Sequence, residues 1–165
     1  MNTAVGIDVS KGKSVVAAMR PFGGVVVPPR EFSHTNAGLS DMAEALRLID
    51  SNTRAILEAT ERYHEPVVVA LREAGIFVSV VNPKLIKDFG NNSLRKVKTD
   101  KADAVKIARY GLEYWEEMRE FTEMDTIRQQ LKLFSRQYNL HMKTVVSLQN
   151  NLISLFHCLI PCFRG

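Results

Sequence analysis

The sequence predicts a mixed α/β domain followed by a long helical segment. The first part of the chain alternates short apolar runs, rich in β-branched residues, with runs of helical period. Such alternation is typical of a sheet covered by helices. The last third instead repeats apolar residues at alternating spacings of three and four, with no Gly or Pro from Met124 through Ile160. We therefore expect a domain over residues 1–120 and a helical segment over 121–165.

The first three elements are expected to be strands of a meander. TAVGIDVS (3–10) and SVVAAMRP (14–21) are apolar runs separated by KGK, in which Gly12 suits a tight turn. VVVPPREF (25–32), after two glycines, is the third predicted strand. The period then changes in NAGLSDMAEALRLID (36–50), for which we expect a helix capped by Asn36. Its apolar face consists of Leu39, Met42, Ala43, Leu46 and Ile49.

Two further strands and two further helices are predicted from the next stretch. RAILEA (54–59) is nearly uninterrupted apolar sequence, as in a strand buried on both sides, and IFVSVVNP (76–83) is a strand ended by Asn82 and Pro83. EPVVVALREAG (65–75) has Pro66 in the first turn of a helix and Gly75 at its end. KLIKDFGNNS (84–93) is a short helix or loop, and TDKADAVKIARYGL (99–112) is a helix.

The apolar repeat of the last third spans five heptads and predicts a helix of roughly 55 Å at about 1.5 Å per residue. That length exceeds the width of a small domain, so we expect the same helix of a second copy as its partner, in a homodimer or higher homo-oligomer. The seam comprises Met124, Ile127, Leu131, Phe134, Tyr138, His141, Val145, Leu148, Leu152, Leu155 and Leu159.

Composition restricts the class of protein. Among 165 residues, 45% are hydrophobic and 24% charged, which is the balance of a folded domain, and the net charge of +4 permits an acidic partner. The amino terminus lacks the features of a signal peptide, and no stretch approaches the roughly 18 apolar residues of a membrane span. We therefore expect a cytoplasmic protein without a membrane partner.

Four acids form a pattern that suggests a metal site. Asp8 and Glu58 lie inside apolar strands, where a charge is costly unless it reaches an edge or a cation. Asp100 and Asp103 project from one face of a helix. Each acid also has an explanation without metal. Asp8 and Glu58 could lie on an outer or edge surface of the sheet. Asp100 could cap the helix, with Asp103 in its first turn. The four together favour one cluster.

A cluster of carboxylates suits chemistry on phosphodiesters. Cutting or transferring such a bond uses two divalent cations about 3.5–4 Å apart, and Mg²⁺ or Mn²⁺ takes carboxylate oxygens. Basic residues that surround the acids would bind phosphates, although a solvated helix face is the alternative. The candidate nucleic-acid contacts are Lys11, Arg95, Lys96, Lys98, Lys101, Lys106 and Arg109.

Four blocks, in order, resemble the DEDD transposases, the Piv/MooV-type recombinases of bacterial insertion sequences (the IS one-ten group). They are GIDVSK, LEAT, VNP and KTDKADAVKIARY, and the resemblance runs from about Gly6 to Leu112. It implies a RuvC-like, ribonuclease H-like fold, a catalytic and metal-binding tetrad on Asp8, Glu58, Asp100 and Asp103, and a coiled coil after the domain. It also implies DNA recombination guided by a structured bridge RNA, and a bacterial, nucleoid-associated location.

The sequence departs from this family at two points. Glu61 follows the EAT block, where the family often has glycine. The family's C-terminal domain carries a nucleophilic serine, for which Ser147 and Ser154 in the heptad helix are poor substitutes. We therefore expect a fragment that binds metal and nucleic acid without completing recombination.

Three other classes of protein remain compatible with the sequence to different degrees. An actin-like sugar or acetate kinase would need glycine two residues after Asp8, where the chain has Ser10. A hydrolytic RuvC-type junction nuclease would share every acid. A non-catalytic dimerisation and nucleic-acid-binding module would use the acids only for capping and solvation.

Overall fold

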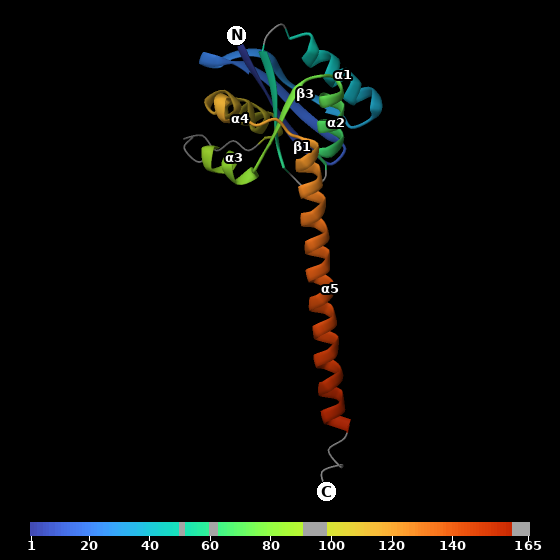
Figure 1. Cartoon of the computed structure of the whole chain (residues 1–165). Coiled ribbons are helices and arrows are strands. Elements are labelled where there is room, and N and C mark those ends of the chain that lie inside the picture. The colour runs from blue at the N-terminus through green and yellow to red at the C-terminus, as the bar shows by residue number, and fades with distance from the viewer. Residues whose placement is uncertain (50–51, 60–62, 91–98, 160–165) are drawn as a thin grey trace. The chain divides into compact units, whose positions relative to one another are not determined.

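The computed structural model describes residues 1–49, 52–59, 63–90 and 99–159. The chain divides into two compact units, Met1–Phe121 and Thr122–Gly165, each described by itself below (Figure 1). The first unit carries the sheet and the short helices, and the second carries one long helix.

A five-stranded mixed sheet forms the centre of the first unit, with strand order β3-β2-β1-β4-β5. Strands β1, β2 and β3 form the predicted antiparallel meander, while β4 pairs parallel to β1, and β5 pairs parallel to β4. The strands span β1 Asn2–Ser10, β2 Lys13–Arg20, β3 Gly24–Ser33, β4 Asn52–Glu58 and β5 Phe77–Val81.

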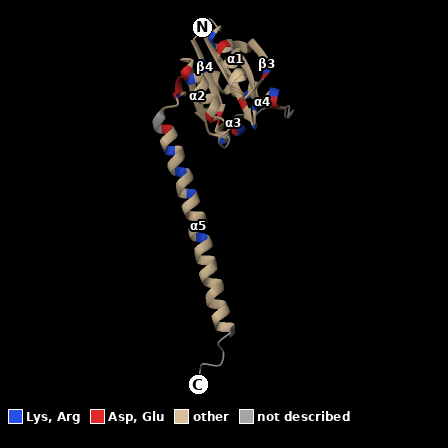
Figure 2. Cartoon of the chain, turned by 90° about the vertical axis from the view of Figure 1, so that its right-hand side faces the viewer, with Lys and Arg blue, Asp and Glu red and all other residues tan. Residues whose placement is uncertain are grey.

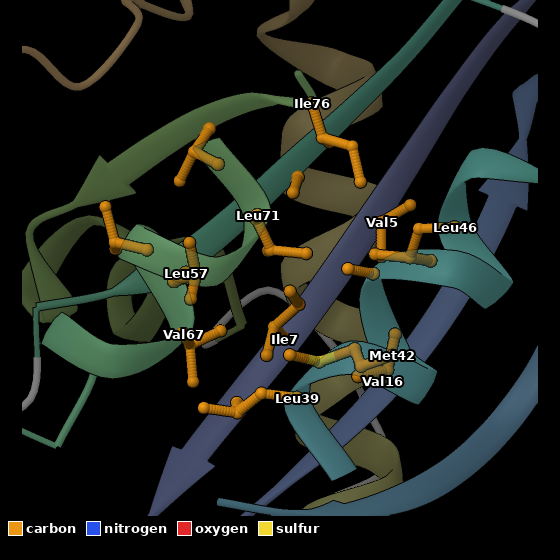
Figure 3. Packing of buried hydrophobic residues seen from close by; sticks show 14 of the residues in the cluster. Val5, Ile7, Val16, Leu39, Met42, Leu46, Leu57, Val67, Leu71 and Ile76 are labelled. Carbon is orange, nitrogen blue, oxygen red and sulfur yellow. The ribbon is translucent and has the colours of Figure 1, made fainter. Parts of the chain in front are cut away.

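Helices cover both faces of this sheet (Figure 1). On one face, Val5 and Ile7 of β1 pack against residues of α1 and α2 such as Met42 and Leu71 (Figure 3). On the other face, Ala4 of β1 belongs to a separate cluster with residues of α3 and α4. The helices are α1 Asn36–Arg47, α2 Glu65–Glu73, α3 Pro83–Gly90 and α4 Asp100–Glu113, and short 3₁₀ turns span Pro21–Gly23 and Trp115–Glu117.

The N-terminal cap of α1 is Thr35, and the prediction of Asn36 as the cap is wrong. The Thr35 hydroxyl accepts a hydrogen bond from the Gly38 amide at 3.1 Å, so Thr35 caps the helix and Asn36 is its first residue. Thr35 has the extended backbone that a cap requires, and its side chain therefore reaches the open amides of the first turn. The predicted features of α2 are confirmed: Pro66 lies in its first turn, and Gly75 beyond its end has φ +75°.

The second unit contains α5 Glu123–Leu159, a helix of 37 residues, as the apolar repeat predicted. Within the single chain, large apolar side chains of this helix are exposed, among them Leu131, Phe134, Tyr138, Leu148 and Leu152. Within the described ranges, no helix has both the length and the apolar character that crossing a membrane demands.

Candidate active site

Asp8 and Glu58 lie side by side at the ends of two adjacent parallel strands. The β1–β4 register pairs Gly6 with Ile56 and Ile7 with Leu57, so the next position brings Asp8 beside Glu58. Side chains alternate between the faces of a strand. Asp8 therefore shares the face of Gly6, and Glu58 shares that of Ile56, which packs against α4. Both carboxylates thus belong to the α4 face, and the alternative of Asp8 on an uncovered outer surface is wrong.

Gly6 explains how α4 comes so close to this face. A Cβ atom on Gly6 would overlap the carbonyl oxygen of Ala104 and the amide nitrogen of Ala108, both in the helix backbone. Near the end of the helix, a Cβ on Gly111 would overlap the Ile56 side chain in the same way. The helix is therefore seated directly on β1 and β4. No role was predicted for Gly6, although a glycine inside an apolar strand indicates close backbone approach.

The first turn of α4 carries the other two acids. Thr99 is the helix cap: its hydroxyl accepts a hydrogen bond from the Ala102 amide at 3.2 Å. Asp100 is therefore the first helical residue, and the alternative reading of Asp100 as the cap is wrong. Asp103 lies three residues later in the same turn. The positive end of the helix dipole favours both carboxylates here, but capping itself accounts for neither side chain.

The electrostatics connect the acids of the strands with those of the helix. Burial raises the pKa of Asp8 to about 6, and the negative charges of Asp103 and Asp100 contribute to the rise. The pKa of Glu58 is also raised, first by burial, then by Asp8 and Asp103, while the Lys106 ammonium opposes that rise. Like charges at this range disfavour simultaneous ionisation. Asp8 therefore lies within electrostatic range of Asp100 and Asp103, and Glu58 within range of Asp8 and Asp103.

Lys106 lies inside this group of acids. Its Nζ atom is 2.9 Å from Oδ1 of Asp103, one helical turn away, and both side chains are about 30% exposed. Of the other candidate phosphate contacts, Lys11, Lys101 and Arg109 are exposed. Arg95, Lys96 and Lys98 lie outside the described residues. The spacing of charges in the sequence did not reveal that Lys106 pairs with an acid, because that depends on its rotamer.

The donor set of this site suits a divalent cation. Carboxylate oxygens are the ligands that Mg²⁺ and Mn²⁺ prefer. The pKa of Asp8 is raised first by burial and then by the negative charges of Asp103 and Asp100, and a bound cation would offset both effects. In the part of the chain that the structure describes, no three acidic, histidine or cysteine side chains are already gathered at coordination distance. Lys106, which pairs with Asp103, supplies positive charge to this site.

A serine–histidine pair elsewhere in the sheet is separate from the acids. The hydroxyl of Ser14 is 2.8 Å from Nε2 of His34, and Ser14 is fully buried. Ser14 is two residues from Val16, so the two share a face of β2, and Val16 packs in the α1–α2 core. Ser14 therefore lies on the opposite face from Asp8. Burial lowers the pKa of His34. This pair satisfies a buried hydroxyl and is not accessible as a nucleophile.

The sheet order and the acids on its central strands define a ribonuclease H-like α/β domain, and comparisons with known proteins identify its family. A model of the DEDD transposase family (IS110 group), described as "Transposase", matches residues 5–161. The chain belongs to this family, which confirms the resemblance found in the sequence.

Solved structures confirm the RuvC-like fold. Thermus thermophilus RuvC in complex with a Holliday junction substrate is 12% identical, with a TM-score of 0.55, over 73% of this chain and 100% of that chain. A second T. thermophilus RuvC structure is 14% identical, also with a TM-score of 0.55, over 72% and 99% of the respective chains. No curated protein matches the sequence.

Proposed function

We propose that this chain provides the RuvC-like catalytic unit of a transposase that cleaves and transfers DNA strands with divalent metal ions. The observation that carries the proposal is the register of β1 and β4, which brings Asp8 beside Glu58 on the face covered by α4. Asp100 and Asp103 enter the same electrostatic environment from the first turn of α4.

Each residue has a distinct part in this proposal. Asp8 and Glu58 would hold Mg²⁺ or Mn²⁺ from rigid strands, and Asp100 and Asp103 from the helix. When bound, such ions activate the attacking oxygen and stabilise the leaving oxygen of a phosphodiester. Lys101 and Arg109, exposed on α4, would bind flanking phosphates and so orient the strand.

The proposed partners are DNA and a structured guide RNA. The RuvC structure that shares this fold is described as bound to a Holliday junction, which supports branched DNA as one partner. A guide RNA is part of the proposal because the resemblance to the DEDD transposases implies one. The exposed apolar seam of α5 supports pairing with the same helix of a second copy, since exposed apolar surface of this extent is unfavourable in water.

Replacing Glu58 with Gln should abolish divalent-metal binding, because an amide is neutral and a weaker ligand than a carboxylate. The measurement is isothermal titration of Mn²⁺ into the metal-free protein. Glu113→Gln, which removes an exposed acid from the far end of α4, is the matched control and should bind as the wild type does. Equal binding by Glu58→Gln and the control would favour a non-catalytic module.

The products of the reaction would distinguish strand transfer from hydrolysis. In active preparations, rejoined strands would indicate transfer, and free ends would indicate hydrolysis.

Replacing Lys106 with Met should strengthen Mn²⁺ binding. In the metal-free protein the Lys106 ammonium pairs with Asp103 and opposes the negative charge near Glu58, so a cation must compete with it. A pair of this exposure is worth up to about 1 kcal/mol, which predicts roughly threefold to fivefold tighter binding. Lys101→Met removes the same charge from an exposed position of α4 and should change affinity less. Weaker binding by Lys106→Met would mean that Lys106 supports the metal site.

A further inference from the structure

The long helix α5 carries positive charge without any compensating acid. From Thr126 to Leu159 the sequence contains no Asp or Glu, although the chain holds 18 in 165 residues, so about four would be expected in 34 residues. Figure 2 shows Lys and Arg along the helix, with acidic colour only near its start. The basic residues of this stretch are Arg128, Lys132, Arg136 and Lys143, and all four are exposed.

These four side chains share one side of the helix. Their spacings of four, four and seven residues place them within an arc of about 80°, since each residue of a helix turns by about 100°. The heptad seam, which includes Ile127, Leu131 and Tyr138, lies on the other side by the same arithmetic. The basic face therefore extends over about 22 Å at 1.5 Å per residue, and it stays available when the seam pairs with a second copy.

The charge pattern does not serve the pairing of copies. In coiled coils, opposite charges at positions that flank the seam usually determine which helices pair. Two identical copies of this stretch offer only positive charges to each other, so these side chains cannot form salt bridges with the same stretch of a second copy. Asp125, just before the stretch, contacts Arg128 at 3.4 Å, which leaves Lys132, Arg136 and Lys143 without an acid on their own segment. A polyanion is the partner that this face fits.

We propose that the basic face of α5 (Arg128, Lys132, Arg136 and Lys143) binds the phosphodiester backbone of nucleic acid. Its length corresponds to about six base-pair steps at 3.4 Å each. These contacts would be to phosphates and not to base edges, so they would add affinity and orientation without sequence preference. The inference rests on the proposed function only in taking nucleic acid as the partner, and it is independent of the metal site.

The test compares two triple variants of the full chain. Lys132→Gln, Arg136→Gln and Lys143→Gln neutralise the basic face, and Arg47→Gln, Arg72→Gln and Arg119→Gln remove three exposed charges from the first unit. Fluorescence anisotropy gives the affinity for a duplex DNA and for a hairpin RNA between 50 and 200 mM salt. For the bound nucleic acid, the slope of log affinity against log salt should fall by about 2 to 3 in the first variant, at about 0.9 per lost contact.

Sedimentation should give the same oligomeric state for the wild type and both triple variants, which separates phosphate binding from pairing of copies. A loss with DNA alone or RNA alone would identify which nucleic acid lies on this face. Equal slopes for the two triple variants would overturn the inference, even if Mn²⁺ binding by the wild type supports the proposed function. Conversely, a reduced slope together with absent Mn²⁺ binding would overturn the metal site and leave this inference in place.

Discussion

Asp8→Asn is expected to abolish divalent-metal binding while stabilising the metal-free protein above pH 6. Burial and the charges of Asp103 and Asp100 raise the pKa of Asp8 from 3.8 to about 6. At neutral pH the folded protein therefore holds an ionised carboxylate in an environment that disfavours it. Asparagine has nearly the same shape without the charge. The substitution therefore removes the cost of burying a charge, the repulsion from Asp103 and Asp100, and a proposed metal ligand.

The dependence on pH follows from the direction of the shift. Because the folded-state pKa of Asp8 exceeds the unfolded value, this carboxyl favours folding most fully below about pH 4, and that contribution is lost as pH rises through about 6. The stability gained by Asp8→Asn should consequently be largest at pH 7–8 and shrink towards pH 4. The wild type should also bind Mn²⁺ less well as pH falls through 6, since protonation of Asp8 competes with the ion.

Thermal unfolding in EDTA and Mn²⁺ titration measure the two effects. Loss of a direct ligand should weaken Mn²⁺ binding by more than about 100-fold, beyond the 10- to 100-fold typical of outer-shell partners. Asp41→Asn, on the exposed side of α1, is the control and should leave both quantities unchanged. A lower melting temperature for Asp8→Asn at pH 8, combined with unchanged Mn²⁺ binding, would contradict the clustering of acids around Asp8.

The order and type of elements could be predicted from the sequence because they depend on local patterns. Apolar runs flanked by glycine and proline located all five strands, and the heptad spacing located α5 to within about one residue at its start. The caps were harder. Thr35 precedes Asn36, and Thr99 precedes Asp100, so each pair offers two good capping residues in succession. The backbone angles decide between them, and those depend on how the chain enters the helix.

The site was predictable to a smaller extent. Asp8 and Glu58 stand out because a charge inside an apolar strand requires a reason, but their adjacency depends on the register between β1 and β4, which are separated by more than 40 residues. Local pattern does not set that register. The pairing of Lys106 with Asp103 depends on a side-chain rotamer, and the spacing of three residues permits this pair without requiring it.

Gly6→Ala is expected to be strongly destabilising and to weaken metal binding, although it adds a single methyl group in β1. The proposed metal ligands of α4, Asp100 and Asp103, are more than 90 residues away in the sequence. The new Cβ would overlap backbone atoms of Ala104 and Ala108, which cannot rotate away as a side chain could. Overpacking of this kind costs typically 1–3 kcal/mol. Relief requires α4 to shift off β1, and that movement carries Asp100 and Asp103 away from Asp8.

Gly24→Ala provides the matched control, because Gly24, like Gly6, is a strand glycine without positive φ. A Cβ atom on Gly24 would lie 3.5 Å from Arg20 Cβ, which is an ordinary contact. Urea unfolding should place Gly24→Ala within about 0.5 kcal/mol of the wild type, with normal Mn²⁺ affinity. Gly6→Ala should lose both stability and affinity. If it lost stability alone, the acids of α4 would not depend on the seating of the helix. If it lost neither, the helix would not rest on β1 as closely as the overlap requires, and the convergence of strand and helix carboxylates would have no structural basis.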